Sequence, residues 1–108
     1  MKDKPTDHIK ELAKQQRRIN RLNSIKNGLE NGSIKEWAQV FAIMSETAIS
    51  IEVEISFYAF KKKLLDPGEF TLNEVMRLAS LVGVKYDVMA DWLRDRIKAK
   101  SKSRIFRD

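Results

Sequence analysis

An all-α fold is predicted by three features of this sequence. The 108 residues include only four glycines and two prolines, fewer than a turn-rich β fold requires. Apolar residues recur at helical spacing along most of the chain. Helix-capping residues stand in front of several of these segments. We therefore expect a compact bundle of four to five helices that contains a helix-turn-helix and is preceded by an extra N-terminal amphipathic helix.

The composition narrows the class of protein. A formal net charge of +6 favours a polyanionic partner. The absence of cysteine excludes a disulfide framework and a thiolate metal site, and it suits a reducing compartment. No apolar run approaches the roughly 20 residues of a membrane span, and the first residues lack the apolar core of a signal peptide. We expect a cytoplasmic protein with no membrane partner.

We divide the chain into three parts: an N-terminal helix with its linker over 1–32, a helix-turn-helix domain over 33–99, and a basic tail over 100–108. The tail has no periodicity and is expected to be frayed.

The N-terminal part predicts an amphipathic helix over 7–28, with Thr6 or Asp7 as its N-cap. We expect Asn27-Gly28 and Asn31-Gly32 to break it, because both residue types tolerate the left-handed conformation of a helix end. The polar face is rich in lysine and arginine. Two interpretations stay open: a solvated face on a helix that packs on the core or on a second subunit, and direct contact with phosphates. The apolar face is formed by Ile9, Leu12, Ile19, Leu22, Ile25 and Leu29.

A capping box at Ser33–Glu36 predicts a helix over 34–44. Its aromatic residues Trp37 and Phe41 fit core anchors better than a stacking platform for bases.

Ser45 is placed to cap a further helix from Glu46 to Val53. The segment Ala48–Ile55 also alternates like a strand, and a strand is a real competitor here. No second alternating segment exists to pair with it, which favours the helix.

The next helices have clear boundaries. Ser56 can cap a helix over Phe57–Leu65, and Asp66-Pro67 ends it, since a residue before proline is driven out of the helical region. A second capping box at Thr71–Glu74 opens a helix that Gly83 closes. A last helix over 87–99 presents Met89, Trp92, Leu93 and Ile97 on one face.

The two short helices over 46–65 have the order and spacing of a helix-turn-helix, in which the second helix places its residues on base edges in the major groove. Ser50 is small, as close approach of the helices requires. Lys63 lies nearer the inner face and is expected to extend its stem along it. The apolar residues that would hold the two helices together are Ile49, Val53, Ile55, Phe60 and Leu64. The outward positions of the second helix are Ser56, Phe57, Tyr58, Lys61, Lys62 and Leu65.

The outward residue types suit DNA. Serine and tyrosine hydroxyls bond phosphates or bases, lysine reaches guanine acceptors or phosphates, and Phe57 can touch a thymine methyl group. The alternative interpretation is that Lys61, Lys62 and Lys63 form a solvated helix end, because cations are stabilising near a helix C-terminus.

The segments IKEWAQVF and SETAISIEVEISFYAFKKKLLDPGEFTLNEVMRLASLVGVKYDVM resemble the phage-repressor-type helix-turn-helix family, called Xre-like or Cro/CI-like. The resemblance covers about Ile34 to Leu93, and DPGEFTLNEVMRLASLVGV is its most specific part. It implies double-stranded DNA binding, homodimerisation and transcriptional regulation of the repressor type. By position, it implies DNA contact at Thr47, near Glu46, and at Ser56, Phe57, Tyr58, Lys61 and Lys62.

Two departures favour an alternative function. Glu54 stands at the turn position that glycine usually fills, where a side chain is strained. Glu46, Glu52 and Glu54 place negative charge where phosphates would approach. The alternative is a protein-interaction module, antitoxin-like or anti-repressor, that keeps the fold without binding DNA.

The sequence does not favour an enzyme. His8 is the only histidine and has no companions for a triad or a metal, and there is no glycine-rich phosphate loop. We predict no catalytic residue, no metal site and no cofactor.

Overall fold

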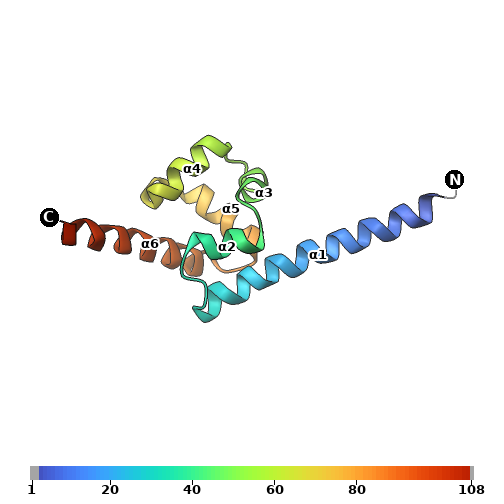
Figure 1. The fold of residues 1–108 in the computed structure, drawn as a ribbon, viewed down its shortest axis with the longest axis horizontal. Coiled ribbons are helices and arrows are strands. Elements are labelled where there is room, and N and C mark those ends of the chain that lie inside the picture. Colours follow the sequence, from blue (N-terminus) through green and yellow to red (C-terminus); the bar gives the residue numbers. More distant parts are fainter. Residues whose placement is uncertain (1–2, 108) are drawn as a thin grey trace.

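The computed structural model describes the backbone of residues 3–107 and the side chains of residues 8–97. Within these residues the fold is all-helical, as predicted, and α3 replaces the competing strand (Figure 1). The elements are α1 (Asp3–Asn31), α2 (Trp37–Ile43), α3 (Glu46–Glu52), α4 (Phe57–Leu65), a 3-10 turn η1 (Pro67–Glu69), α5 (Leu72–Val82) and α6 (Tyr86–Arg107).

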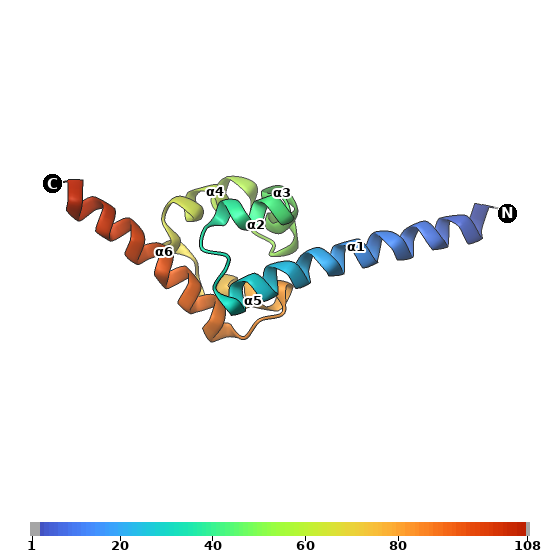
Figure 2. The ribbon, with the colours of Figure 1, turned by 60° about the horizontal axis from the view of Figure 1, so that its bottom comes forward.

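The short helices α2 to α5 form a body, and the two long helices α1 and α6 extend from it in opposite directions (Figure 1). A turned view shows the body seated between these two arms, with α3 and α4 on its far side from the point where the arms meet (Figure 2). The molecule is consequently elongated, with extents of 67 × 30 × 23 Å. Among the described residues, no helix is both long and apolar enough to cross a bilayer.

The helix α1 ends later than predicted. It passes through Gly28 and stops at Asn31, and Gly32 adopts the left-handed φ of 83° that ends it. Gly28 has another role: a β-carbon there would overlap the Ile34 side chain, and the Ile34 amide donates to the Gly28 carbonyl at 3.0 Å. The expected break at Asn27-Gly28 was therefore wrong, because this glycine allows the returning chain to pack closely on α1.

The predicted capping box at Ser33–Glu36 was also wrong. The helix α2 begins only at Trp37, with Glu36 at its N-cap position. The Gln39 side chain ties the preceding loop together, because its oxygen accepts from the amides of Lys35 at 2.6 Å and Glu36 at 3.0 Å. Its nitrogen donates to the Ser33 carbonyl at 2.9 Å.

The predicted N-cap at Thr6 or Asp7 was wrong, because α1 already begins at Asp3. The boundaries between Ser45 and Gly83 follow the sequence closely. The Ser45 and Ser56 hydroxyls accept from the third residues of their helices, each at 3.1 Å. Thr71 and Glu74 form the expected reciprocal capping box, and Gly83 ends α5 with φ 90°. The last helix extends further than 99: the backbone of 100–107 continues α6, while side chains from 98 onward lie outside the described residues.

An aromatic cluster joins the body to α6. Trp37 stacks on Phe41 with 5.5 Å between ring centroids and meets Trp92 edge-on at 4.9 Å. The Trp92 indole N–H donates to the Ile34 carbonyl at 2.7 Å in a buried site. Phe60 is fully buried among the same rings. Trp37 and Phe41 thus belong to the core packing, as predicted.

Candidate nucleic-acid interface

The helices α3 and α4 are joined by a tight turn over residues 53–56. Val53 is fully buried, and the Ile55 amide donates to the Ser50 carbonyl at 3.0 Å, which closes the turn. Ser50 is 2% exposed, and its hydroxyl donates to the Thr47 carbonyl at 2.8 Å. Ser50 can be buried between the two helices because it is small and its hydroxyl is hydrogen-bonded within α3. The two short helices can therefore pack closely.

The turn contains a residue with a strained backbone, and a side chain of α5 binds the carbonyls of this turn. Glu54 has φ 58°, and it is the one described non-glycine residue with a positive φ. The Arg77 guanidinium, from α5, donates to the Val53 carbonyl at 2.6 Å and reaches the Glu54 carbonyl at 3.4 Å. Arg77 therefore binds the turn carbonyls that α3 leaves without helical partners. Sequence reasoning missed Arg77, because a contact across 24 residues has no local signal.

We expect Glu54→Gly to raise the free energy of unfolding by about 0.5–1 kcal/mol, because glycine adopts this conformation without a β-carbon clash. Denaturant unfolding measures the change. Glu54→Ala is the matched control, since it removes the same carboxylate but keeps the β-carbon. Equal effects of the two substitutions would show that charge, not strain, is responsible.

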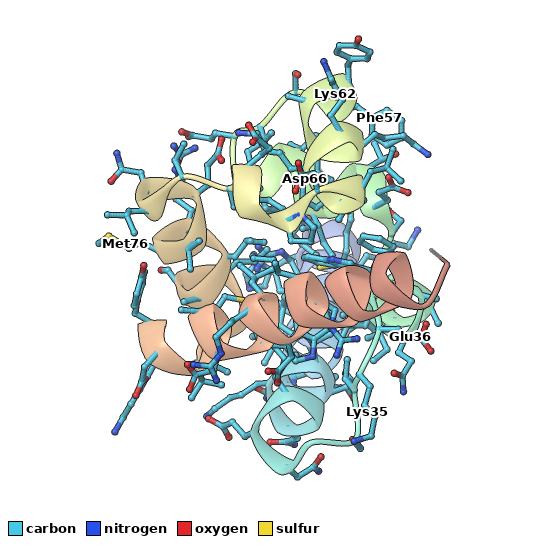
Figure 3. All side chains as sticks on the ribbon, turned by 90° about the vertical axis from the view of Figure 1, so that its left-hand side faces the viewer. Lys35, Glu36, Phe57, Lys62, Asp66 and Met76 are labelled. Atoms are coloured by element: carbon cyan, nitrogen blue, oxygen red, sulfur yellow. The ribbon has the colours of Figure 1, made fainter. Side chains whose placement is uncertain are left out.

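All the predicted DNA-contact residues are exposed. The outward face of α4 carries two lysine–aromatic pairs, and in each pair the lysine lies one helical turn after the ring. The Lys61 ammonium lies 5.4 Å from the Phe57 ring centroid, and the Lys62 ammonium lies 5.3 Å from the Tyr58 ring centroid. Figure 3 shows Phe57 and Lys62 projecting from the edge of the molecule, away from Lys35 and Glu36. Cation–π contacts of this kind hold the lysines against the helix surface.

Ser56 and Thr47 occupy different positions from the lysines. The Ser56 oxygen accepts the capping bond of α4, which leaves its hydroxyl hydrogen available to a ligand. Thr47 is exposed in the first turn of α3, beside Glu46. The Lys61 ammonium lies 3.6 Å from the Glu46 carboxylate, so the beginning of α3 and the outward face of α4 adjoin.

Lys63 turns inward, as predicted, and it has a specific partner there. Its ammonium contacts both carboxylate oxygens of Glu74 at 2.6 Å, which ties α4 to α5. Burial raises the pKa of Glu74, but the hydrogen bonds from Lys63 and Thr71 outweigh it, so the pKa lies below its ordinary value. Lys63 is thus a structural residue and leaves Lys61 and Lys62 as the outward cations of α4.

Two of the acids that oppose a polyanion have basic partners. Glu46 pairs with Lys61, and Glu52 pairs with Arg18 of α1 at 2.8 Å. Neutralised carboxylates repel phosphate less than isolated ones. Within the described residues, no group of three histidine, cysteine, aspartate or glutamate side chains gathers in metal-binding geometry.

Comparisons with protein-family models, with curated proteins and with solved structures found no match to this chain.

Proposed function

We propose that the chain binds double-stranded DNA through α4, as a helix-turn-helix regulator of the repressor type acting as a homodimer. The observation that carries the proposal is the outward face of α4. It combines hydroxyl, aromatic and cationic side chains, and α4 contains no acidic residue. These are the groups that contact phosphates and base edges.

The connection to α3 supports the same proposal. A short helix precedes α4, a strained tight turn joins the two, and a buried small residue lies between them. In a helix-turn-helix, such a first helix rests across the DNA backbone while the second enters the major groove. Thr47, at the start of α3, then lies toward the phosphates.

A second candidate function is docking of another protein on the same face. Large apolar side chains are prominent there, with Tyr58 73% and Leu65 72% exposed, and Ile51 of α3 68% exposed. Exposed aromatic and aliphatic residues in one region are typical of protein interfaces. Glu54, which has no basic partner among the described side chains, favours this candidate over DNA.

We expect the wild type to bind random-sequence duplex DNA with a steep salt dependence, measured by fluorescence anisotropy. The variant Lys61→Glu/Lys62→Glu is expected to bind at least about tenfold more weakly at low salt. The slope of log affinity against log salt should fall by about two, because two phosphate-facing cations are lost.

The matched control is Lys35→Glu/Lys85→Glu, which changes the net charge equally at two exposed residues outside α3 and α4. We expect this control to keep most of the salt slope. If both double variants lose binding equally, net charge rather than α4 attracts the DNA. If the wild type does not bind at low salt, the DNA proposal fails and the protein-docking candidate replaces it.

A further inference from the structure

The N-terminal half of α1 projects beyond the body of the molecule (Figures 1 and 2). From residue 8 to residue 21 every side chain is exposed except Arg18, which is half-buried and makes the ion pair with Glu52. The helix packs into the core only from Leu22 onward. Three of the exposed side chains in the projecting segment are large and apolar: Ile9, Leu12 and Ile19, at 65%, 52% and 48%.

This projecting segment gains little stability by itself. Isolated helices of about a dozen residues are marginal in water. Like charges also recur four residues apart, at Lys10 with Lys14, Lys14 with Arg18, and Arg17 with Arg21, and such pairs destabilise a helix. Burial of its apolar residues against a partner would supply the missing stabilisation.

The apolar residues form a seam in coiled-coil spacing. Ile9, Leu12, Gln16 and Ile19 follow one another at intervals of three, four and three residues, which is the a/d pattern of two heptads. This stripe differs from the one that packs on the body, because the buried Leu22, Ile25 and Leu29 lie on another side of the helix.

Within residues 8–21, the charged side chains all lie away from this seam. The positions that flank it, e and g, hold the residues His8, Ala13, Gln15 and Asn20. All the charged side chains of the segment occupy the outer positions b, c and f: Lys10, Glu11, Lys14, Arg17, Arg18 and Arg21. Two copies of this basic helix can therefore approach along the seam without lysine or arginine facing its like across the interface.

The last helix does not offer an equivalent surface in its described part. Its largest apolar side chain, Trp92, is buried and bonded to the Ile34 carbonyl. Before residue 98, α6 exposes two large hydrophobic side chains, Tyr86 at its start and Ile97 near the end of the described side chains.

We infer that residues 8–20 of α1 pair with the same residues of a second copy as a short parallel coiled coil. The parallel orientation follows from Gln16. The Gln16 nitrogen donates to the Asn20 side-chain oxygen at 2.9 Å, which leaves the Gln16 amide oxygen to be satisfied. In a parallel pair the two Gln16 amides meet and can bond each other, whereas an antiparallel pair buries this oxygen opposite Leu12. The inference deepens the proposed function by naming the dimer surface, but the pairing itself requires no DNA.

Parallel pairing also places both bodies at the same end of the coiled coil. The basic stripe formed by Lys10, Lys14, Arg17 and Arg21 stays outside the seam and open to phosphates.

The mass of the full chain, measured by sedimentation across a concentration series without DNA, tests the inference. We expect a reversible dimer, and Leu12→Lys should raise its dissociation constant by about tenfold or more, because a buried leucine is lost from each copy. The matched control Glu11→Lys places a lysine at an outer position and should leave the dimer intact. Circular dichroism checks that both variants keep their helices.

Because the chain lacks cysteine, single-cysteine variants report the orientation. Under mild oxidation we expect Gln16→Cys to form an interchain disulfide and Lys14→Cys, on the outer face, not to. A monomer at all concentrations, or a dimer that Leu12→Lys leaves unchanged, would overturn the inference. A Leu12-dependent dimer in which Gln16→Cys does not crosslink would overturn its parallel form. These outcomes are independent of DNA binding, so the failure of one proposal does not imply failure of the other.

Discussion

Phe60→Ala is expected to lower the free energy of unfolding by about 3–5 kcal/mol, which is a large part of the 5–15 kcal/mol that a domain of this size has. Phe60 is fully buried and belongs to α4. Its ring lies about 6 Å from those of Trp37, Phe41 and Phe70, at 6.1, 6.2 and 6.1 Å. Truncation therefore removes the contacts that join α4 to α2 and to the segment after η1.

Denaturant unfolding followed by tryptophan fluorescence measures this loss, because Trp37 reports on the same cluster. Phe57→Ala is the matched control: the same residue type in the same helix, but on the exposed face. We expect the control to change stability by less than about 1 kcal/mol. Similar losses for both variants would mean that α4 is not anchored through Phe60.

Sequence reasoning predicted most of the helices from Ser45 to Gly83. In this region each boundary has a local chemical cause: serine or threonine caps, a proline stop, and a glycine at the helix end. Boundaries with local causes can be predicted from a single sequence, since they involve residues no more than four positions apart.

Two boundaries between α1 and α2 were predicted wrongly, for different reasons. Gly28 looked like a helix end, but it lies inside α1 because Ile34 packs against it. Ser33 looked like a cap, but the Gln39 side chain organises the loop and delays α2 to Trp37. The Gly28 contact has no signature in the local pattern, because it depends on the path of the loop between α1 and α2. The Gln39 contacts do have one, because Gln39 lies three residues after Glu36, at the spacing of a capping box, and the prediction took the box one turn too early.

Some residues of the candidate site could be predicted from the sequence, and others could not. The outward residues of α4 could be predicted from helical periodicity, and so could the inward turn of Lys63. The positive φ at Glu54 was predicted from the resemblance. The residues that hold the site in place, Arg77 and Arg18, were not predicted, since long flexible side chains reach partners that sequence spacing does not reveal.

Glu74→Gln is expected to lower the free energy of unfolding by about 1.5–3 kcal/mol at pH 7, because hydrogen bonds to charged groups are worth that much and Lys63 would lose its carboxylate partner. The two side chains are mostly buried, at 18% and 12% exposure, so solvent cannot replace the pair fully. Glu69→Gln, at an exposed carboxylate of the nearby turn, is the matched control and should stay within about 0.5 kcal/mol.

The same pair predicts the direction of a pH dependence. The pKa of Glu74 in the folded protein lies below the ordinary value of 4.5, so the folded state binds the carboxylate proton less tightly than the unfolded state. The stability that Glu74 contributes is present in full above the unfolded pKa and is lost as the pH falls through the folded pKa. Unfolding at a series of pH values should therefore show the wild type and Glu74→Gln well separated at neutral pH and converging in acid. If the separation stayed constant from neutral pH into acid, the loss would come from the hydrogen bond between the Thr71 amide and the Glu74 side chain, and not from the negative charge of Glu74 beside Lys63.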